Sequence, residues 1–295
     1  MQISDNPLQG KTILVTGATS GIGRVTAAAL AKMGAAVYCV GRDPQRTQST
    51  VTEIQNESAN QQVYGLLANL ASFQEIRALA HEIHQRTERL DVLVNNAGAI
   101  FLSRKLSQDG IELTFALNHL AYFLLTNLLL DLLKTTAAEV GEARVVNVAS
   151  AAHTGAHMHF DDLQFEHGYG GMRAYGQSKL ANVLFTYELA RRLAGSAVSA
   201  NALHPGFVAS RFATNNGPLA KIAMQLARLI AISPEEGAQT SIYLASSPEV
   251  KGVSGKYFVK SQPVRSDPAS YDEQAARRLW EISAKMVGLE QAVVS

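Results

Sequence analysis

Short apolar runs alternate with longer amphipathic stretches along most of this chain. The runs are rich in β-branched side chains, which is typical of strands that are buried on both faces of a parallel sheet. They cover residues 12–16, 36–40, 63–67, 91–94, 143–148, 197–203 and 256–259. Helical spacing of apolar residues follows Pro44 and covers 72–86, 108–133, 172–194, 234–246 and about 268–287. This alternation predicts an α/β fold, a doubly wound, Rossmann-like and mostly parallel sheet of about seven strands with helices on both faces.

The ends of the expected helices carry suitable capping residues. Asp43 before Pro44 supplies an N-cap and a first-turn proline, and Ser72 and Ser233 each stand three residues before a glutamate, as in a capping box. No repeat, low-complexity tract or linker divides the sequence. We therefore expect one domain over residues 1–295.

Composition narrows the choice of partners. The 295 residues are 47% hydrophobic with a formal net charge of +1 and no basic run, so a small molecule is a better candidate ligand than nucleic acid. Cys39 is the only cysteine, which excludes an intramolecular disulfide. The longest apolar stretch, 120–133, is shorter than the roughly 20 residues of a membrane span, and the N-terminus has no apolar core. We expect no transmembrane segment and a cytoplasmic location.

Three glycines follow the first strand. Gly17, Gly21 and Gly23 lead directly into a helical pattern. A glycine-rich turn at a helix N-terminus leaves room for a pyrophosphate beside free backbone amides. The spacing is Gly-x-x-x-Gly-x-Gly and not Gly-x-Gly-x-x-Gly, and a plain turn would explain one or two of the glycines. Three at one junction predict a phosphate site.

Tyr175 and Lys179 stand four residues apart on an expected helix, so they share one face. An ammonium near a phenol favours the phenolate and lowers the pKa of the tyrosine from about 10 toward a range useful for proton transfer. The same spacing also occurs on solvated helix faces. Other residues must therefore show whether Tyr175 and Lys179 form a catalytic pair.

Several further motifs make the chain resemble the short-chain dehydrogenase/reductase family over about residues 10–260. The shared motifs are Thr16-Gly17-x-x-x-Gly21-x-Gly23, Asn95-Asn96-Ala97-Gly98, Asn118, Ser150, Tyr175-x-x-x-Lys179 and Pro205-Gly206. Residues 117–126, 150–153, 178–185 and 254–258 are similar to the retinol dehydrogenase group. The resemblance implies a dinucleotide-binding half at about 10–150 and a catalytic and substrate-binding half at about 151–260.

The resemblance also implies residue roles. Tyr175 would be the general acid/base, Ser150 would hydrogen-bond the substrate oxygen, Lys179 would hold the nicotinamide ribose and Asn118 would anchor a water in a proton relay. Ser150 could instead only cap a strand end, and Asn118 could be a buried structural amide. The implied cofactor contacts are Gly17, Thr19, Ser20, Gly21, Ile22, Gly23, Arg24, Arg42, Asn69, Leu70, Asn96, Ala97, Gly98, Tyr175, Lys179, Pro205, Gly206, Val208 and Ser210. Asn69 departs from the family, which commonly has Asp there, but its carbonyl can still accept from adenine.

The end of the second strand indicates which cofactor is used. Gly41 occupies the usual acidic position of NAD-dependent members, Arg42 follows it, and Asp43 is explained by capping. Arg42 is a candidate partner of a 2′-phosphate, with Arg24 as a second. We therefore expect NADP(H).

The expected substrate is an apolar aldehyde or ketone and its alcohol, with retinal/retinol as one possibility. The pocket walls are assigned to 151–171, with Phe160, Phe165 and Tyr169, and to Phe207, Phe212 and the apolar stretch 219–232. The histidines of 151–171 lack the acidic or Cys ligands of a metal framework, so no metal is expected.

Two further expectations concern the protein as a whole. The apolar helices 108–133 and 172–194 make a homodimer plausible. The competing function is a non-catalytic NADP(H)-binding sensor or scaffold, which would be expected to have lost one of Asn118, Ser150, Tyr175 and Lys179.

Overall fold

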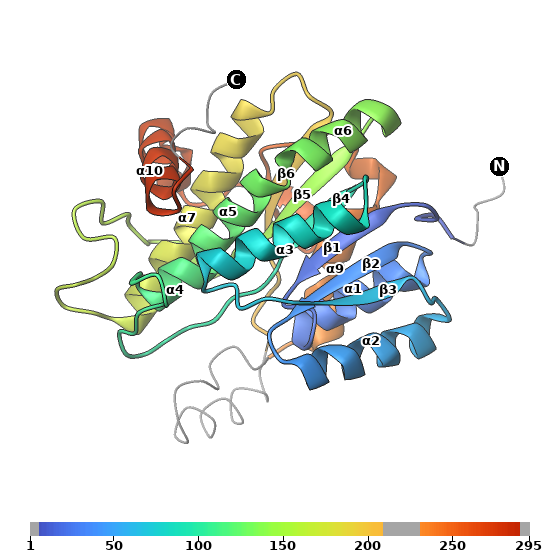
Figure 1. Ribbon diagram of the computed structural model, residues 1–295. Coiled ribbons are helices and arrows are strands. Elements are labelled where there is room, and N and C mark those ends of the chain that lie inside the picture. The colour runs from blue at the N-terminus through green and yellow to red at the C-terminus, as the bar shows by residue number, and fades with distance from the viewer. Residues whose placement is uncertain (1–5, 209–230, 290–295) are drawn as a thin grey trace.

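The computed structural model describes residues 6–208 and 231–289, and they form one sheet flanked by helices (Figure 1). The strands are β1 (Thr12–Thr16), β2 (Ala36–Gly41), β3 (Val63–Leu67), β4 (Val92–Asn95), β5 (Ala143–Val148), β6 (Val198–His204), β7 (Tyr257–Val259) and β8 (Gln262–Val264). The larger helices are α1 (Gly21–Lys32), α2 (Pro44–Ser58), α3 (Phe73–Arg86), α5 (Ala121–Leu128), α6 (Leu130–Val140), α7 (Gly171–Arg192), α9 (Pro234–Ser246) and α10 (Glu273–Met286).

The strand order is β3-β2-β1-β4-β5-β6-β7-β8, and every pair is parallel except β7 with β8. The predicted doubly wound fold is confirmed. The prediction of about seven strands missed β8, a three-residue antiparallel edge strand whose residues are all exposed. It was missed because it lacks the apolar run that marks the other strands.

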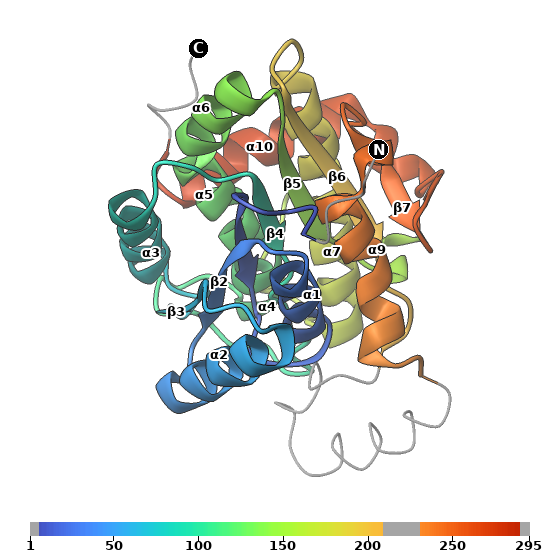
Figure 2. The same ribbon diagram turned by 90° about the vertical axis from the view of Figure 1, so that its right-hand side faces the viewer.

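Helices cover both faces of the sheet (Figures 1 and 2). On β1, Leu14 belongs to the apolar core shared with α3, α5 and α7, whereas Ile13 and Val15 belong to the core shared with α1, α2 and α9. All five residues of β1 are buried. This two-sided burial explains the continuous apolar runs, because side chains of a strand alternate between the faces.

The predicted N-caps are confirmed, but the capping boxes are incomplete, since Glu75 Oε2 accepts from Asn69 N at 2.7 Å and not from Ser72 N. The side chains of Asp43, Ser72 and Ser233 accept from the backbone N–H groups of Arg46 (2.8 Å), Glu75 (3.4 Å) and Glu236 (3.1 Å). These caps fix where α2, α3 and α9 begin.

The expected helix over 108–133 is broken into shorter pieces. A three-residue helix, α4 (Leu113–Phe115), continues as a π-helical turn (Ala116–Leu120) into α5, and α6 follows after Leu129. The apolar pattern runs through these breaks, so spacing alone could not reveal them. Within the described residues no single helix is long and apolar enough to cross a bilayer, and Leu113–Leu128 reaches that length and composition only together with Leu130–Val140, across a 55° bend.

The C-terminal helix packs on α7 and α5. The expected helix at about 268–287 begins as a 3₁₀ turn (Pro268–Tyr271), and α10 follows it. The ring of Trp280 contacts Phe123 of α5 and Phe185 of α7, with centroids 4.9 and 5.7 Å away. The apolar helices that made a homodimer plausible therefore bury part of their surface within the chain, and the homodimer stays a prediction.

Candidate active site

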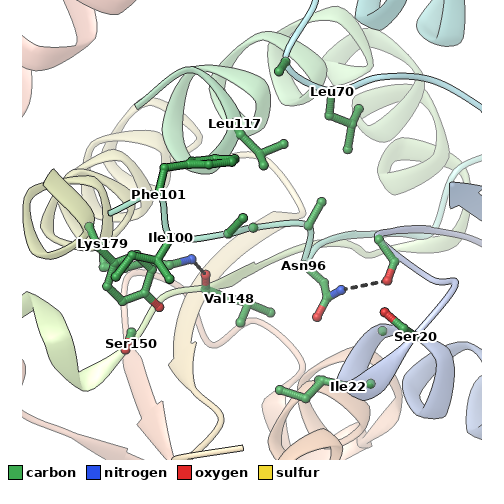
Figure 3. A pocket seen from close by; sticks show the side chains of 18 of the residues that line it. Ser20, Ile22, Leu70, Asn96, Ile100, Phe101, Leu117, Val148, Ser150 and Lys179 are labelled. Atoms are coloured by element: carbon green, nitrogen blue, oxygen red, sulfur yellow. Dashed lines mark hydrogen bonds between the residues drawn. The ribbon is translucent and has the colours of Figure 1, made fainter. Parts of the chain in front are cut away.

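One cavity of about 1470 Å³ lies along the carboxyl ends of β1, β2, β4, β5 and β6 (Figure 3). The sheet order reverses between β1 and β4, and ligands of doubly wound sheets bind at such a reversal. Seventeen of the predicted contact residues line it: Gly17, Thr19, Ser20, Gly21, Ile22, Gly23, Arg42, Asn69, Leu70, Asn96, Ala97, Gly98, Tyr175, Lys179, Pro205, Gly206 and Val208. Ser150 also lines it, whereas Ser210 lies outside the described residues.

The glycine turn after β1 packs closely against the turn after β4. A Cβ at Gly23 would lie 2.4 Å from Asn96 Nδ2 and from Gly17 O, so no side chain fits there. The Thr16 hydroxyl accepts from the N–H groups of Asn96 (2.9 Å) and Ala97 (3.1 Å), and Asn96 Nδ2 donates to Thr16 O (2.8 Å). This bracing by Thr16 was not recognised from the sequence.

The N-terminus of α1 is suited to an anion. Ser20 occupies the N-cap position, but its side chain makes no capping hydrogen bond. Ser20, Gly21, Ile22 and Gly23 all line the cavity. An uncapped first turn offers backbone N–H groups and the positive end of the helix dipole to a phosphate, so these residues fit a dinucleotide pyrophosphate.

The segment after β2 places two arginines at the cavity. Arg42 and Arg46 line it, and within the described residues neither guanidinium forms an ion pair or a hydrogen bond. Arg24 does not line it; its guanidinium pairs instead with Glu53 (3.3 Å) and Glu57 of α2. The second arginine at the cavity is therefore Arg46 and not Arg24; Arg46 lies four residues beyond Arg42, in the first turn of α2.

Ser150 and Tyr175 are hydrogen-bonded at the other end of the cavity. Ser150 Oγ also accepts from Ala152 N at 3.2 Å and caps a 3₁₀ turn (Ala151–His153), so its structural role is real as well. His153 Nδ1 lies 2.7 Å from Ser150 O, and Asp267 N donates to His153 Nε2 at 3.1 Å. Both nitrogens of this histidine are therefore used in holding the Ser150 turn.

Lys179 was expected to lower the pKa of Tyr175, and the structure shows no such lowering. Its Nζ donates to Val148 O at 2.9 Å, and burial lowers its pKa to about 7 (Figure 3). Burial raises the pKa of Tyr175 to about 12, although the hydrogen bond from Ser150 lowers it. The expected depression of the tyrosine pKa is not found in this structure, because burial raises the pKa of Tyr175 more than the hydrogen bond from Ser150 lowers it.

Asn118 lies beside the cavity within the π-helical turn and does not line it. Its Nδ2 donates to Ala99 O (2.9 Å) and Ser178 Oγ (3.0 Å), and its Oδ1 accepts from Ala99 N (2.9 Å). Both amide hydrogens are thus used within the protein. The side chain holds the segment after β4 against α7, as in the structural alternative, and the water-anchoring role of Asn118 stays a prediction.

The apolar end of the cavity includes Phe207, as predicted, but most of its other described walls are residues that we did not assign to it. Its walls include Ile100, Phe101, Leu102, Leu106, Leu113, Leu117, Met172 and Phe207. Of the segment 151–171, only Ala151 and Ala152 line it. Phe165 is buried, Phe160 packs under Arg278, and the Tyr169 hydroxyl donates to Phe101 O at 2.8 Å. Phe212 and residues 219–230 lie outside the described residues.

The assignment of residues 151–171 to the pocket wall was largely wrong for a simple reason. Aromatic content alone does not tell whether a loop residue faces a cavity or the core. The segment that does form the wall, 99–117, follows the Asn96–Gly98 motif directly, so its position after a strand end was the available signal.

Comparison with known proteins identifies the family. The family model described as short chain dehydrogenase matches residues 11–219. The chain belongs to the short-chain dehydrogenase family. It is 43% identical to human Retinol dehydrogenase 13 over 96% of this chain and 86% of that protein, and 44% identical to human Retinol dehydrogenase 14 over 96% and 88%. The solved Pseudomonas aeruginosa RhlG/NADP active-site complex matches with a TM-score of 0.69 and 30% identity over 87% of this chain and 97% of that one. Members of this family are oxidoreductases, so the chain belongs to that class of enzyme.

Proposed function

We propose that this protein is an NADP(H)-dependent oxidoreductase that interconverts an apolar aldehyde or ketone and its alcohol. The observation that carries the proposal is one continuous cavity, which runs from the uncapped N-terminus of α1 to the hydrogen-bonded Ser150 and Tyr175. The bound nicotinamide would supply or accept the hydride. The side chains of the protein would supply the proton and orient the carbonyl group of the substrate.

Tyr175 is the proton donor in the reduction direction. With its pKa raised to about 12, the phenol is protonated at neutral pH and can donate to a carbonyl oxygen. Ser150, which contacts the same hydroxyl, offers a second hydrogen bond to that oxygen. Lys179 would hold the nicotinamide ribose, and its charge would assist the return of the proton in the oxidation direction.

Preference for NADP(H) is supported by steric and electrostatic features of the turn after β2. A Cβ at Gly41 would lie 2.2 Å from Thr47 Oγ1 and 2.5 Å from Thr19 Cγ2, so there is no space for a carboxylate that could accept from ribose hydroxyls. Arg42 and Arg46 are exposed cations at the same end of the cavity. A 2′-phosphate between them would gain charge-assisted hydrogen bonds.

The substrate class is supported by the walls around Phe101, Leu117 and Met172. Among the described lining residues, the two arginines, Arg42 and Arg46, belong to the segment after β2, while the apolar walls come from the segment after β4, α7 and Phe207. Burial of apolar surface contributes about 25 cal/mol per Å², so longer apolar carbonyl compounds should bind better. The names of the two retinol dehydrogenases agree with an apolar substrate.

The test is kcat/KM for matched aldehydes that differ in chain length or in a terminal carboxylate, with NADPH and with NADH. We expect kcat/KM to rise with apolar length, and Arg42→Ala and Arg46→Ala each to reduce the NADPH preference about tenfold or more, the loss of a hydrogen bond to a charged group. Arg24→Ala is the matched control and should change the preference much less. Equal use of both cofactors by the wild type, or preference for short or carboxylated aldehydes, would contradict the proposal.

A further inference from the structure

The ammonium of Lys179 has unusual neighbours for a buried cation. Only 3% of the residue is exposed, and within the described residues Nζ forms one hydrogen bond, to Val148 O, and no ion pair. Two aromatic rings lie close to the ammonium. The ring centroid of Tyr175 is 5.7 Å from Nζ, and the ring centroid of Tyr122, on α5, is also 5.7 Å away. The cation is therefore held by a carbonyl and two rings and not by a carboxylate.

The neutral surroundings matter because burial opposes the charge. Desolvation lowers the pKa of Lys179 to about 7, and no charged neighbour contributes to the shift. Another polar group nearby is the neutral amide of Asn118, since a Cβ at Gly98 would lie 3.1 Å from its Oδ1 and 3.5 Å from Nζ. The negative face of an aromatic ring within about 6 Å attracts a cation, more strongly when both are desolvated.

Tyr122 belongs to the apolar core, and its ring also lies beside the ammonium of Lys179. It is 1% exposed, does not line the cavity, and its hydroxyl donates to Val148 O at 3.5 Å, the same carbonyl that accepts from Lys179. Tyr175 is already assigned to proton transfer. Tyr122 is thus the neighbour of Nζ whose contribution to the ammonium can be separated from the chemistry.

We propose that Tyr122 is a positioning residue whose ring holds the Lys179 side chain in its charged form beside Val148. It acts through Lys179 and contacts neither substrate nor cofactor. The family resemblance assigns no role to this position. The catalytic consequence rests on the proposed role of Lys179, whereas the electrostatic effect of the ring does not.

The direct test is the pKa of Lys179 by NMR of lysine labelled with ¹³C at Cε, with Lys179→Arg used to assign the signal. Tyr122→Phe keeps the ring and should leave the pKa near its wild-type value. Tyr122→Leu removes the ring and should lower it by roughly 0.5–1 unit, the shift that corresponds to a cation–π contact. Tyr122→Leu also leaves a cavity, so a second variant is needed. With 3,4,5-trifluorophenylalanine at position 122 the ring is kept but its face is less negative, and the pKa of Lys179 should again fall.

The kinetic readout is the pH profile of kcat/KM with NADPH. A weaker ring contact lets the ammonium lose its proton at lower pH, so the basic limb should move down with the pKa in the Leu and trifluorophenylalanine variants and stay in place in Tyr122→Phe. A pKa that is the same in all variants would overturn the inference. A pKa that falls while the pH profile stays fixed would support the role of the ring and contradict the catalytic role proposed for Lys179.

Discussion

The hydroxyl of Tyr175 illustrates how a residue depends on its surroundings for its acidity. Its pKa is raised to about 12 by burial, against the lowering effect of the hydrogen bond from Ser150. The sequence located both residues, because each belongs to a motif with a fixed place in the chain. It could not give the balance between burial and charge, which depends on the packing of α7 against β5 and α5.

Tyr175→Phe should remove only the transferable proton. We expect kcat to fall about 10²- to 10⁴-fold, the usual contribution of general acid catalysis, while the Kd for NADPH from fluorescence titration changes little. Lys179→Ala is the comparison, since it should lower kcat and also weaken the binding of NADPH. A Tyr175→Phe enzyme with more than half of the wild-type kcat would show that another group donates the proton.

At the level of elements, the strands were predicted well and the irregular helices poorly. A strand buried on both faces has an apolar run that can be read locally, as in β1 and β5, whose residues are all buried. The π-helical turn that contains Asn118 has the same apolar composition as the helices beside it. Its extra residue is set by contacts with Ala99 and Ser178, which are distant in sequence, so local spacing carries no sign of it.

The helix α10 contributes to stability through one large side chain. Trp280 packs on Phe123 and Phe185, and the Arg192 guanidinium lies 4.3 Å from its ring. Trp280→Ala should lower the free energy of unfolding by about 3–5 kcal/mol, as for other buried aromatic truncations. Urea unfolding would measure the loss. Arg277→Ala, on the exposed side of the same helix, should cost less than about 0.5 kcal/mol, and equal losses would mean that α10 is not docked through Trp280.

For the whole molecule, the pH dependence of stability should reflect a histidine that the sequence did not single out. His119 is fully buried among Phe115, Phe123 and Phe185, with Nε2 2.8 Å from Ser283 Oγ of α10. Burial lowers its pKa to about 3 from 6.5. Below pH 6.5 the unfolded chain binds a proton that the folded chain does not, so stability falls as the pH drops toward 3, by about 1.4 kcal/mol per unit.

This effect can be isolated by comparing variants at pH 7 and pH 5. His119→Phe removes the titrating group. Between pH 7 and pH 5 its free energy of unfolding, measured with urea, should fall by about 2 kcal/mol less than that of the wild type. At pH 7 it should be less stable than the wild type, because Ser283 loses its partner. His84 is the control, because its contacts with Ala80 O and Asp131 raise its pKa. Replacing His84 should therefore increase the loss of stability between pH 7 and pH 5, the opposite of the effect of His119→Phe. Equal acid losses in wild type and His119→Phe would exclude His119 as the source.

The close packing at Gly41 also has an evolutionary consequence. A carboxylate at this position is the simplest route from NADP to NAD, but its first carbon would overlap Thr47 and Thr19. Thr47 in turn donates to Asp43 O at 2.7 Å and belongs to the first turn of α2. The change therefore cannot be gained in one beneficial step; a neighbour must first become smaller, at some cost to the start of the helix. The proposed dependence on NADP would thus be preserved by the order in which substitutions can be accepted, even under selection for NAD.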